Sequence, residues 1–390
     1  MWAPSPLKFC EDATEWDVEG SGRKLVLLSC DPGRKEWNTV MGPLQDAAPK
    51  AQLWVVDPAS DSPAGSPVGL KNFPGSTSDF HPLGIEVFKT PKGDILYVVN
   101  HQATRSTIEL FALTLAKSKQ GRVVATYIAT LDHPSFTGAP NALAVISPTA
   151  FYLSHDHRFT RRSRGILSTL LNRVETLVAL PLSRVDLVEI SGDPKLKPEV
   201  RVFTVATGLA FANGLALSHD RHTLAVASTT HRTVKFYAVN SETHALKLRE
   251  QVPLPFLVDN LSLAPRAWSV EGGDVFLAAG HPHFFSLAAA AAGKELGAAA
   301  THPSSWVVAI SPRTTNATDA DDLAASYPAS MRAVQSARWE LTTLFQSNGG
   351  KEEGAFGMST SGVGGVGADG RRWMVVTGLY AEGARFLRES

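Results

Sequence analysis

The most constraining feature of the sequence is a recurring pattern, in which a small polar residue directly precedes a strand of alternating apolar residues. Clear copies begin at Asn141 (NALAV), Asn213 (NGLAL) and Asp259 (DNLSL), and a related copy begins at His81 (HPLGIEV). Weaker counterparts occur around residues 10–12 and 354–365. These openings define about six units of roughly 50 to 70 residues, each with room for about four short strands, which is typical of a β-propeller.

Short segments of strand length and β-rich composition fill the units, and turn sequences such as TPKGD and GADGRR separate them. We therefore predict an all-β fold, a six-bladed β-propeller that forms a single domain over residues 1–390. Two segments depart from the pattern: an amphipathic helix at about 163–180 and an Ala-rich insertion at about 286–303. Because the repeat spacing is irregular, a pair of β-sandwiches is the competing architecture.

Composition excludes several classes of protein. The 37 basic and 37 acidic residues balance, so no broad basic field is available for nucleic acid. No apolar run reaches the roughly 18 residues of a membrane-spanning helix. Two cysteines, Cys10 and Cys30, exclude a disulfide framework and a Cys-based zinc site but allow one bridge. The opening MWAPSPLKFC lacks a signal-peptide pattern, which predicts a cytoplasmic protein as written and a secreted one if the N-terminus is incomplete.

The propeller prediction gives the polar openings a chemical meaning, because the first residue of each innermost strand would point into the central channel. Asn141, Asn213, Asp259 and Asn260 would then surround one axis together with Glu11. Carboxylate and amide oxygens suit calcium, whereas zinc and copper prefer imidazole or thiolate. The alternative interpretation is that each Asn only caps a turn before a strand.

The chain resembles the paraoxonase/arylesterase family of calcium-dependent six-bladed propeller hydrolases. The segments that carry the resemblance follow one another in family order: SDFHPLGIEV, LYVVNHQATRSTIELFAL, PNALAV, PTAFYLSHDHRF, FANGLALSHD, LVDNLSLAP and FLAAGHPH. The resemblance implies a catalytic calcium held by Glu11, Asn141, Asn213, Asp259 and Asn260. It also implies a second, structural calcium, for which Asp12 and the backbone carbonyl near Ile85 match. Ala142 replaces a carboxylate ligand of that ion, which puts the second site in doubt.

The resemblance further implies a histidine pair near the catalytic ion that activates water. His101 matches one member, whereas Leu83 occupies the position of the other. His81 lies two residues before Leu83 and is a possible substitute. Asp156, His157 and His281 match positions close to the family's site. We expect the first two to support Asn141 and His281 to contact substrate, with a simple turn histidine as the alternative for His281.

The function implied is calcium-dependent hydrolysis of small carboxylic esters and lactones, without a covalent nucleophile. A gluconolactonase-type sugar-lactone hydrolase is one alternative, and a propeller that binds partners without catalysis is another. Apolar residues around the expected site favour an apolar substrate over a sugar: Phe80, Leu83, Phe159, Phe284 and Phe285. The helix at 163–180 resembles a segment that covers the family's active-site mouth, where it would either contact a membrane peripherally or pack on the propeller.

Overall fold

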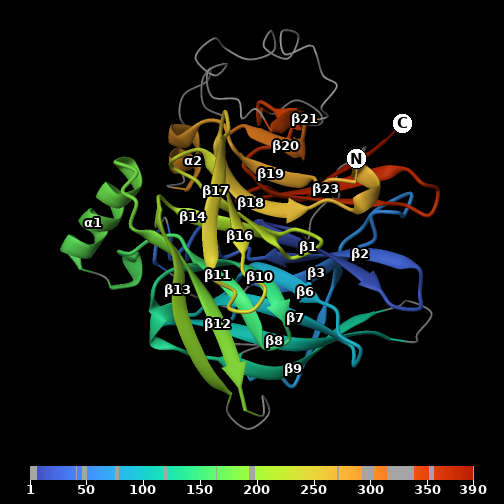
Figure 1. Cartoon of the computed structure of the whole chain (residues 1–390), viewed down its shortest axis with the longest axis horizontal. Coiled ribbons are helices and arrows are strands. Elements are labelled where there is room, and N and C mark those ends of the chain that lie inside the picture. Colours follow the sequence, from blue (N-terminus) through green and yellow to red (C-terminus); the bar gives the residue numbers. More distant parts are fainter. Residues whose placement is uncertain are drawn as a thin grey trace.

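The computed structural model arranges the chain as a ring of six sheets (Figure 1). It describes residues 7–40, 42–45, 51–74, 79–116, 122–163, 165–192, 198–269, 272–291, 303–313, 338–350 and 355–389. The first strand of each sheet contacts the first strand of the next, and the last of them contacts β1, so that the ring is closed. The prediction of a six-bladed propeller is confirmed, and the alternative of paired sandwiches is wrong.

The first three sheets contain the N-terminal half of the chain. Sheet one comprises β1 (Cys10–Val18), β2 (Arg23–Cys30), β3 (Gln52–Val56) and β4 (Ser66–Pro67). Sheet two comprises β6 (Pro82–Phe88), β7 (Asp94–His101), β8 (Ser106–Leu115), β9 (Val123–Leu131) and the parallel edge strand β5 (Gly69–Lys71). Sheet three comprises β10 (Pro140–Ser147), β11 (Ala150–His155), β12 (Ser183–Ser191) and β13 (Glu199–Leu209).

The last three sheets complete the ring. Sheet four comprises β14 (Ala212–Leu217), β15 (Thr223–Ser228), β16 (Thr233–Val239) and β17 (Leu246–Pro253). Sheet five comprises β18 (Leu257–Leu263), β19 (Phe276–His281), β20 (Ser305–Pro312) and β21 (Trp339–Ser347). Sheet six comprises β22 (Ser359–Val366), β23 (Arg372–Gly378) and β24 (Arg385–Arg388).

The hydrophobic core lies between neighbouring sheets rather than at the axis. Trp16 and Leu27 of sheet one, for example, pack in one cluster with Ile85 and Phe111 of sheet two. Further clusters of this kind join sheets two and three, three and four, and four and five. Because apolar side chains fill the space between the sheets, the polar residues that begin the first strands lie near the axis of the ring.

Each first strand is irregular near its start. The register with the second strand shifts between Cys10 and Asp12 in β1, between Pro140 and Leu143 in β10, and at the equivalent places in β6, β14, β18 and β22. Such bulges interrupt the ladder and redirect side chains, often beside active sites. The residues inside the shifts include all five predicted calcium ligands: Glu11, Asn141, Asn213, Asp259 and Asn260.

Among the described residues, two α-helices lie outside the sheets. α1 (Ile166–Leu177) confirms the helix predicted at 163–180 and projects from one side of the ring (Figure 1). α2 (Phe284–Ala291) covers the start of the Ala-rich insertion, whereas residues 292–302 of that insertion lie outside the described part of the chain. Three short 3-10 helices span Pro134–Thr137, Arg161–Ser163 and Arg266–Trp268. No helix in the described ranges is both long and apolar enough to cross a bilayer.

Candidate active site and metal centre

The predicted ligands meet at one cavity. A pocket of about 720 Å³ is lined by Glu11, Asn141, Asn213 and Asp259, among other residues. The fifth predicted ligand, Asn260, is adjacent because its amide nitrogen donates to Glu11 Oε1 at 3.0 Å. All five side chains are buried. The sequence prediction that these residues come together is therefore matched by their positions, while binding of an ion to them stays a prediction.

Four of the five residues carry a buried side-chain oxygen that has no hydrogen-bond partner among the described residues. These atoms are Glu11 Oε2, Asn141 Oδ1, Asn213 Oδ1 and Asn260 Oδ1. A buried polar atom without a partner costs about 1–3 kcal/mol, so several in one place require an explanation. The described residues contain no group of three or more His, Cys, Asp or Glu suited to a metal, so a cation here would depend on the amide oxygens. Hard oxygen donors of this kind fit calcium.

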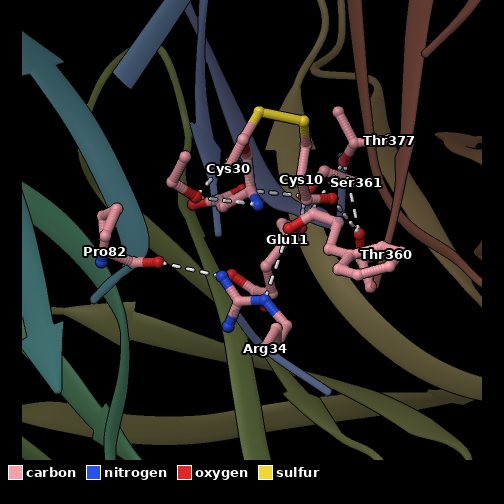
Figure 2. The surroundings of a disulfide bond; sticks show 11 residues. Cys10, Glu11, Cys30, Arg34, Pro82, Thr360, Ser361 and Thr377 are labelled. Carbon is pink, nitrogen blue, oxygen red and sulfur yellow. Dashed lines mark hydrogen bonds between the residues drawn. A yellow bond between two sulfur atoms is a disulfide. The ribbon is translucent and has the colours of Figure 1, made fainter. Parts of the chain in front are cut away.

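The charges around Glu11 also favour a cation. Burial, followed by the negative charges of Asp12 and Asp259, raises the pKa of the Glu11 carboxyl well above its usual value. Arg34 opposes this effect, and its guanidinium donates to the backbone carbonyls of Phe9 and Pro82 (Figure 2). One buried arginine faces several buried carboxylates, and a divalent cation would supply the missing positive charge.

The Cys10–Cys30 disulfide fixes the start of β1 beside these groups. The two residues lie opposite one another in the β1–β2 register, and the bridge closes a separation of 20 residues. In Figure 2 the disulfide lies above Glu11, and Arg34 lies below it. The bridge therefore holds the strand that carries the Glu11 carboxylate against its neighbour.

Two side chains outside the ring orient its members. His281 lines the cavity and donates from Nε2 to Asp259 Oδ2 at 2.7 Å, and its Nδ1 has no partner among the described residues. On the opposite side, the Asn141 amide lies 3.5 Å from Asp156 Oδ2. His157 donates to Asp156 Oδ1 at 2.9 Å, and its other ring nitrogen lies 2.7 Å from Thr176 of α1. Asp156 and His157 are thus placed to support Asn141 as predicted, whereas His281 is bonded to Asp259, and its predicted contact with substrate stays a prediction.

His101, predicted as general base, has both ring nitrogens engaged. Nε2 donates to the carbonyl oxygen of Pro140 at 2.6 Å, so Nδ1 is the acceptor for the hydroxyl of Thr39 at 2.5 Å. Burial, followed by the charge of Arg162, lowers the pKa of His101 to about 3. The ring is therefore neutral at neutral pH and joins β7 to the start of β10. It is not among the residues that line the cavity, and its catalytic role stays a prediction.

His81 is bound to a carboxylate, and Leu83 occupies the place of the family histidine. His81 Nδ1 lies 2.8 Å from Asp31 Oδ2, and its ring contacts Trp37 at 6.1 Å between centroids. Leu83, at the position of the missing histidine, lines the cavity instead. Whether His81 acts in place of that histidine stays a prediction.

The second, structural ion does not fit the residues present. Asp12 Oδ1 accepts the Ala13 amide at 2.8 Å and the Ser361 hydroxyl at 2.7 Å, and Asp12 Oδ2 accepts the Ile85 amide at 2.9 Å. Both carboxylate oxygens thus have protein donors. Ala142 contributes no side-chain oxygen, so these hydrogen bonds argue against a second ion, whose binding stays a doubtful prediction.

Sequence reasoning missed several residues of the site. Arg34, Arg161 and Phe211 line the cavity, and Ser361 of β22 holds Asp12. None follows the repeating pattern at a recognisable position, except that Thr360 and Ser361 occupy the bulge of the sixth first strand. The weak sequence counterpart at 354–365 indicated that strand. No neighbouring residue in the sequence indicated that one of its hydroxyls would bind Asp12.

A family model described as Arylesterase matches residues 45–319, which is more than half of the chain. The chain belongs to the arylesterase (paraoxonase) family. It is 29% identical to serum paraoxonase/lactonase 3 of Oryctolagus cuniculus over 237 residues, which cover 60% of this chain and 58% of that protein. It is 27% identical to serum paraoxonase/arylesterase 1 of Homo sapiens over 234 residues, with the same 60% and 58% coverage.

The match to these paraoxonases thus spans just over half of their length. Among solved structures, an aldose sugar dehydrogenase from Streptomyces coelicolor in its PQQ-bound form aligns with a TM-score of 0.50 at 11% identity. That alignment covers 100% of this chain and 97% of the other. At such low identity the likeness shows the propeller fold alone. Glu11 precedes the family match, so its place in the arylesterase site depends on the geometry described above.

Proposed function

We propose that this arylesterase-family protein is a calcium-dependent hydrolase of carboxylic esters and lactones. The observation that carries the proposal is the set of buried, unpartnered oxygens of Glu11, Asn141, Asn213 and Asn260 around a cavity of about 720 Å³. Bound calcium would polarise the substrate carbonyl and stabilise the oxyanion that develops on it.

The residues of the chain supply the rest of the reaction. Leu83, Phe211, Leu257 and Phe284 give the cavity apolar walls that hold the body of a substrate and exclude water. Asp259 has one carboxylate oxygen bonded to His281, which fixes both side chains. We propose that His281 accepts the proton of the attacking water, because it lines the cavity. Both ring nitrogens of His101 are instead engaged by Thr39 and Pro140.

Calcium-dependent turnover tests the proposal. Purified protein should hydrolyse phenyl acetate and a panel of aliphatic lactones in calcium, and lose the activity in chelator. Asn213→Ala removes one unpartnered oxygen and should weaken calcium binding. The variant should therefore need a higher calcium concentration for half-maximal activity. Asn240→Ala, in a turn of sheet four, is the matched control and should leave the activity unchanged.

Two outcomes would favour the alternatives. Turnover confined to sugar lactones would indicate a gluconolactonase-type enzyme. Calcium binding without turnover of any ester or lactone would indicate a binding module that retains the ligand ring. The apolar cavity walls argue against the first of these, and the Asp259–His281 pair beside the ring argues against the second.

A further inference from the structure

Several positively charged residues line the cavity in addition to the predicted calcium ligands and the apolar walls. These residues are Arg34, Lys35, Arg161 and Arg173. Arg34 is committed to the Phe9 and Pro82 carbonyls, and the Lys35 ammonium lies 4.9 Å from the centre of the Phe9 ring. Arg161 and Arg173 have no ion pair or ring contact of this kind among the described residues.

Arg161 and Arg173 line the same cavity and lack a carboxylate partner among the described residues. In the described part of the chain neither forms an ion pair. Burial raises the pKa of the Tyr380 phenol near Arg161, so this group supplies no negative charge at neutral pH. Burial, followed by the charge of Arg173, lowers the pKa of Arg161, as expected for a half-buried guanidinium that shares its cavity with a second cation. An anion placed between them would offset this effect.

The structure holds Arg161 in place. Its Nε donates to Asn172 Oδ1 at 3.0 Å, and the amide of Asn172 donates to the Phe159 carbonyl at 2.8 Å. Asn172 is buried at 2% exposure although it lies on a surface helix. The bond uses only Nε of the guanidinium. Nη1 packs against Gly42, and the terminal nitrogens have no hydrogen bond among the described residues. A guanidinium fixed in this way is suited to bidentate binding of a carboxylate or phosphate.

The helix that carries Arg173 is anchored to the same site. Glu175 of α1 accepts the backbone amides of Arg158 at 2.9 Å and Phe159 at 3.0 Å. Thr176 lies 2.7 Å from His157, which is bonded to Asp156 beside Asn141. Arg161 and the helix that carries Arg173 are thus anchored beside the cavity that the predicted calcium ligands also line.

From these observations we propose that the substrate carries an anionic group, a carboxylate or phosphate, which Arg161 and Arg173 bind while the ester or lactone reaches the ligand ring. The inference rests on the proposed function for the reacting group and adds the class of substrate. The apolar walls of the cavity accept a short aliphatic linker. Neutral esters would be hydrolysed with lower efficiency because they leave the cation pair uncompensated.

Matched substrates test the proposal. Mono-4-nitrophenyl glutarate carries a free carboxylate, and its methyl ester is neutral with nearly the same shape. A third substrate, 4-nitrophenyl 4-phosphonobutanoate, distinguishes a phosphate-type ligand from a carboxylate. We expect kcat/KM for at least one anionic substrate to exceed that for the methyl ester by about tenfold or more. The preference should decrease with added salt, since Arg173 is exposed.

Variants locate the effect. Arg173→Gln removes an exposed charge with little risk to folding, and Arg161→Gln removes the anchored one. Each should reduce the preference, and the double variant should abolish it while turnover of the neutral ester persists. Arg249→Gln, on the exposed face of β17, changes net charge equally and should have no effect. An unchanged preference in the double variant, or equal efficiency on charged and neutral substrates, would overturn the proposal.

A binding measurement separates this inference from the proposed function. Glutarate should raise the melting temperature of the wild-type protein in chelator, and neutral glutaramide should not. The shift should vanish in the double variant. If no ester is hydrolysed but glutarate stabilises through these arginines, the hydrolase proposal fails and the anion site stands. If phenyl acetate is hydrolysed but glutarate has no effect, the anion site fails alone.

Discussion

At the scale of single residues, the two histidines near the ring have different surroundings and therefore different expected roles. His281→Gln should lower kcat/KM for phenyl acetate by about a hundredfold or more, because a positioned proton acceptor typically contributes that much. The control is His219→Gln, since His219 is also bonded to a carboxylate, Asp274, at 2.5 Å but lies away from the cavity. Equal activity of both variants would remove His281 from the mechanism.

His101→Gln gives the complementary prediction. Its ring joins Thr39 to the Pro140 carbonyl, and loss of buried bonds of this kind costs about 1–3 kcal/mol. We expect a lower free energy of unfolding in urea, with Thr39→Val showing part of the same loss. The prediction of His101 as general base requires a large fall in turnover per folded molecule instead. Measuring both quantities on the same preparations decides between the two roles.

The hydrogen bonds of Asp12 predict the number of ions. Because Ala13, Ile85 and Ser361 occupy both carboxylate oxygens, calorimetric titration should give one calcium per chain. Ser361→Ala removes one of these donors and its contact with the Glu11 backbone carbonyl at 3.2 Å, but no side-chain oxygen of the predicted ring, and should not create a second site. A stoichiometry of two in the wild-type protein would contradict this account of Asp12.

The ring ligands could be predicted from sequence because each precedes a recognisable apolar alternation. Asn141 and Asn213 are examples, and the residues in front of their strands carry the signal locally. Arg161 and Ser361 had no such signal. Ser361 meets Asp12 only because the ring closes sheet six on sheet one, and Arg161 reaches the cavity only because Asn172 turns it inward. Contacts that form because the ring closes, or because one side chain orients another, produce no periodic pattern in the sequence.

At the scale of elements, α1 combines a fixed polar face with an exposed apolar one. Asn172 and Thr176 face the site, whereas Ile166 is 91% exposed and Leu167 is 67% exposed. Leu170 and Leu177 extend this apolar surface. Of the two roles expected from sequence, packing on the propeller does not account for the exposed residues. A helix with one apolar face outside is suited to a membrane surface.

Vesicle binding tests this role of α1. The protein should cosediment with vesicles of phosphatidylcholine and phosphatidylserine, and the variant with Ile166→Ser and Leu167→Ser should bind several-fold more weakly, since each buried methylene contributes about 0.8 kcal/mol. Phe203→Ser, an exposed apolar residue on β13, is the control and should bind as the wild type does. Equal binding of all three proteins would contradict a membrane role.

Elements were easier to predict than their irregularities. Strands such as β7 and β19 follow from β-branched and apolar runs bounded by turns, and the helix at 166–177 follows from its periodicity. The bulges at the start of the first strands were not predicted, although they place the ligands. A bulge shifts the pairing register without changing the amino-acid composition of the strand. It can therefore be recognised only once the partner strand is in place.

At the scale of the whole molecule, the ring ligands come from sheets one, three, four and five, so one ion would tie four blades together at the axis. A ligand bound only by the folded state stabilises it by mass action, by about 2.7 kcal/mol at a hundredfold excess over Kd. Chelator should therefore lower the melting temperature, and the midpoint should rise with the logarithm of calcium concentration. Asp259→Ala should abolish this dependence.

Amide hydrogen exchange would show whether calcium stabilises all six blades or only the four that carry predicted ligands. The first strands β6 and β22 contribute no ring ligand, but they contact β1 and complete the closed ring. If the propeller unfolds as one cooperative unit, calcium should slow exchange in these two strands as much as in β10 and β14. Protection limited to the ligand-bearing blades would show that the ion stabilises only its own strands. Identical melting in calcium and in chelator would contradict the metal site itself, because native-state binding cannot leave the unfolding equilibrium unchanged.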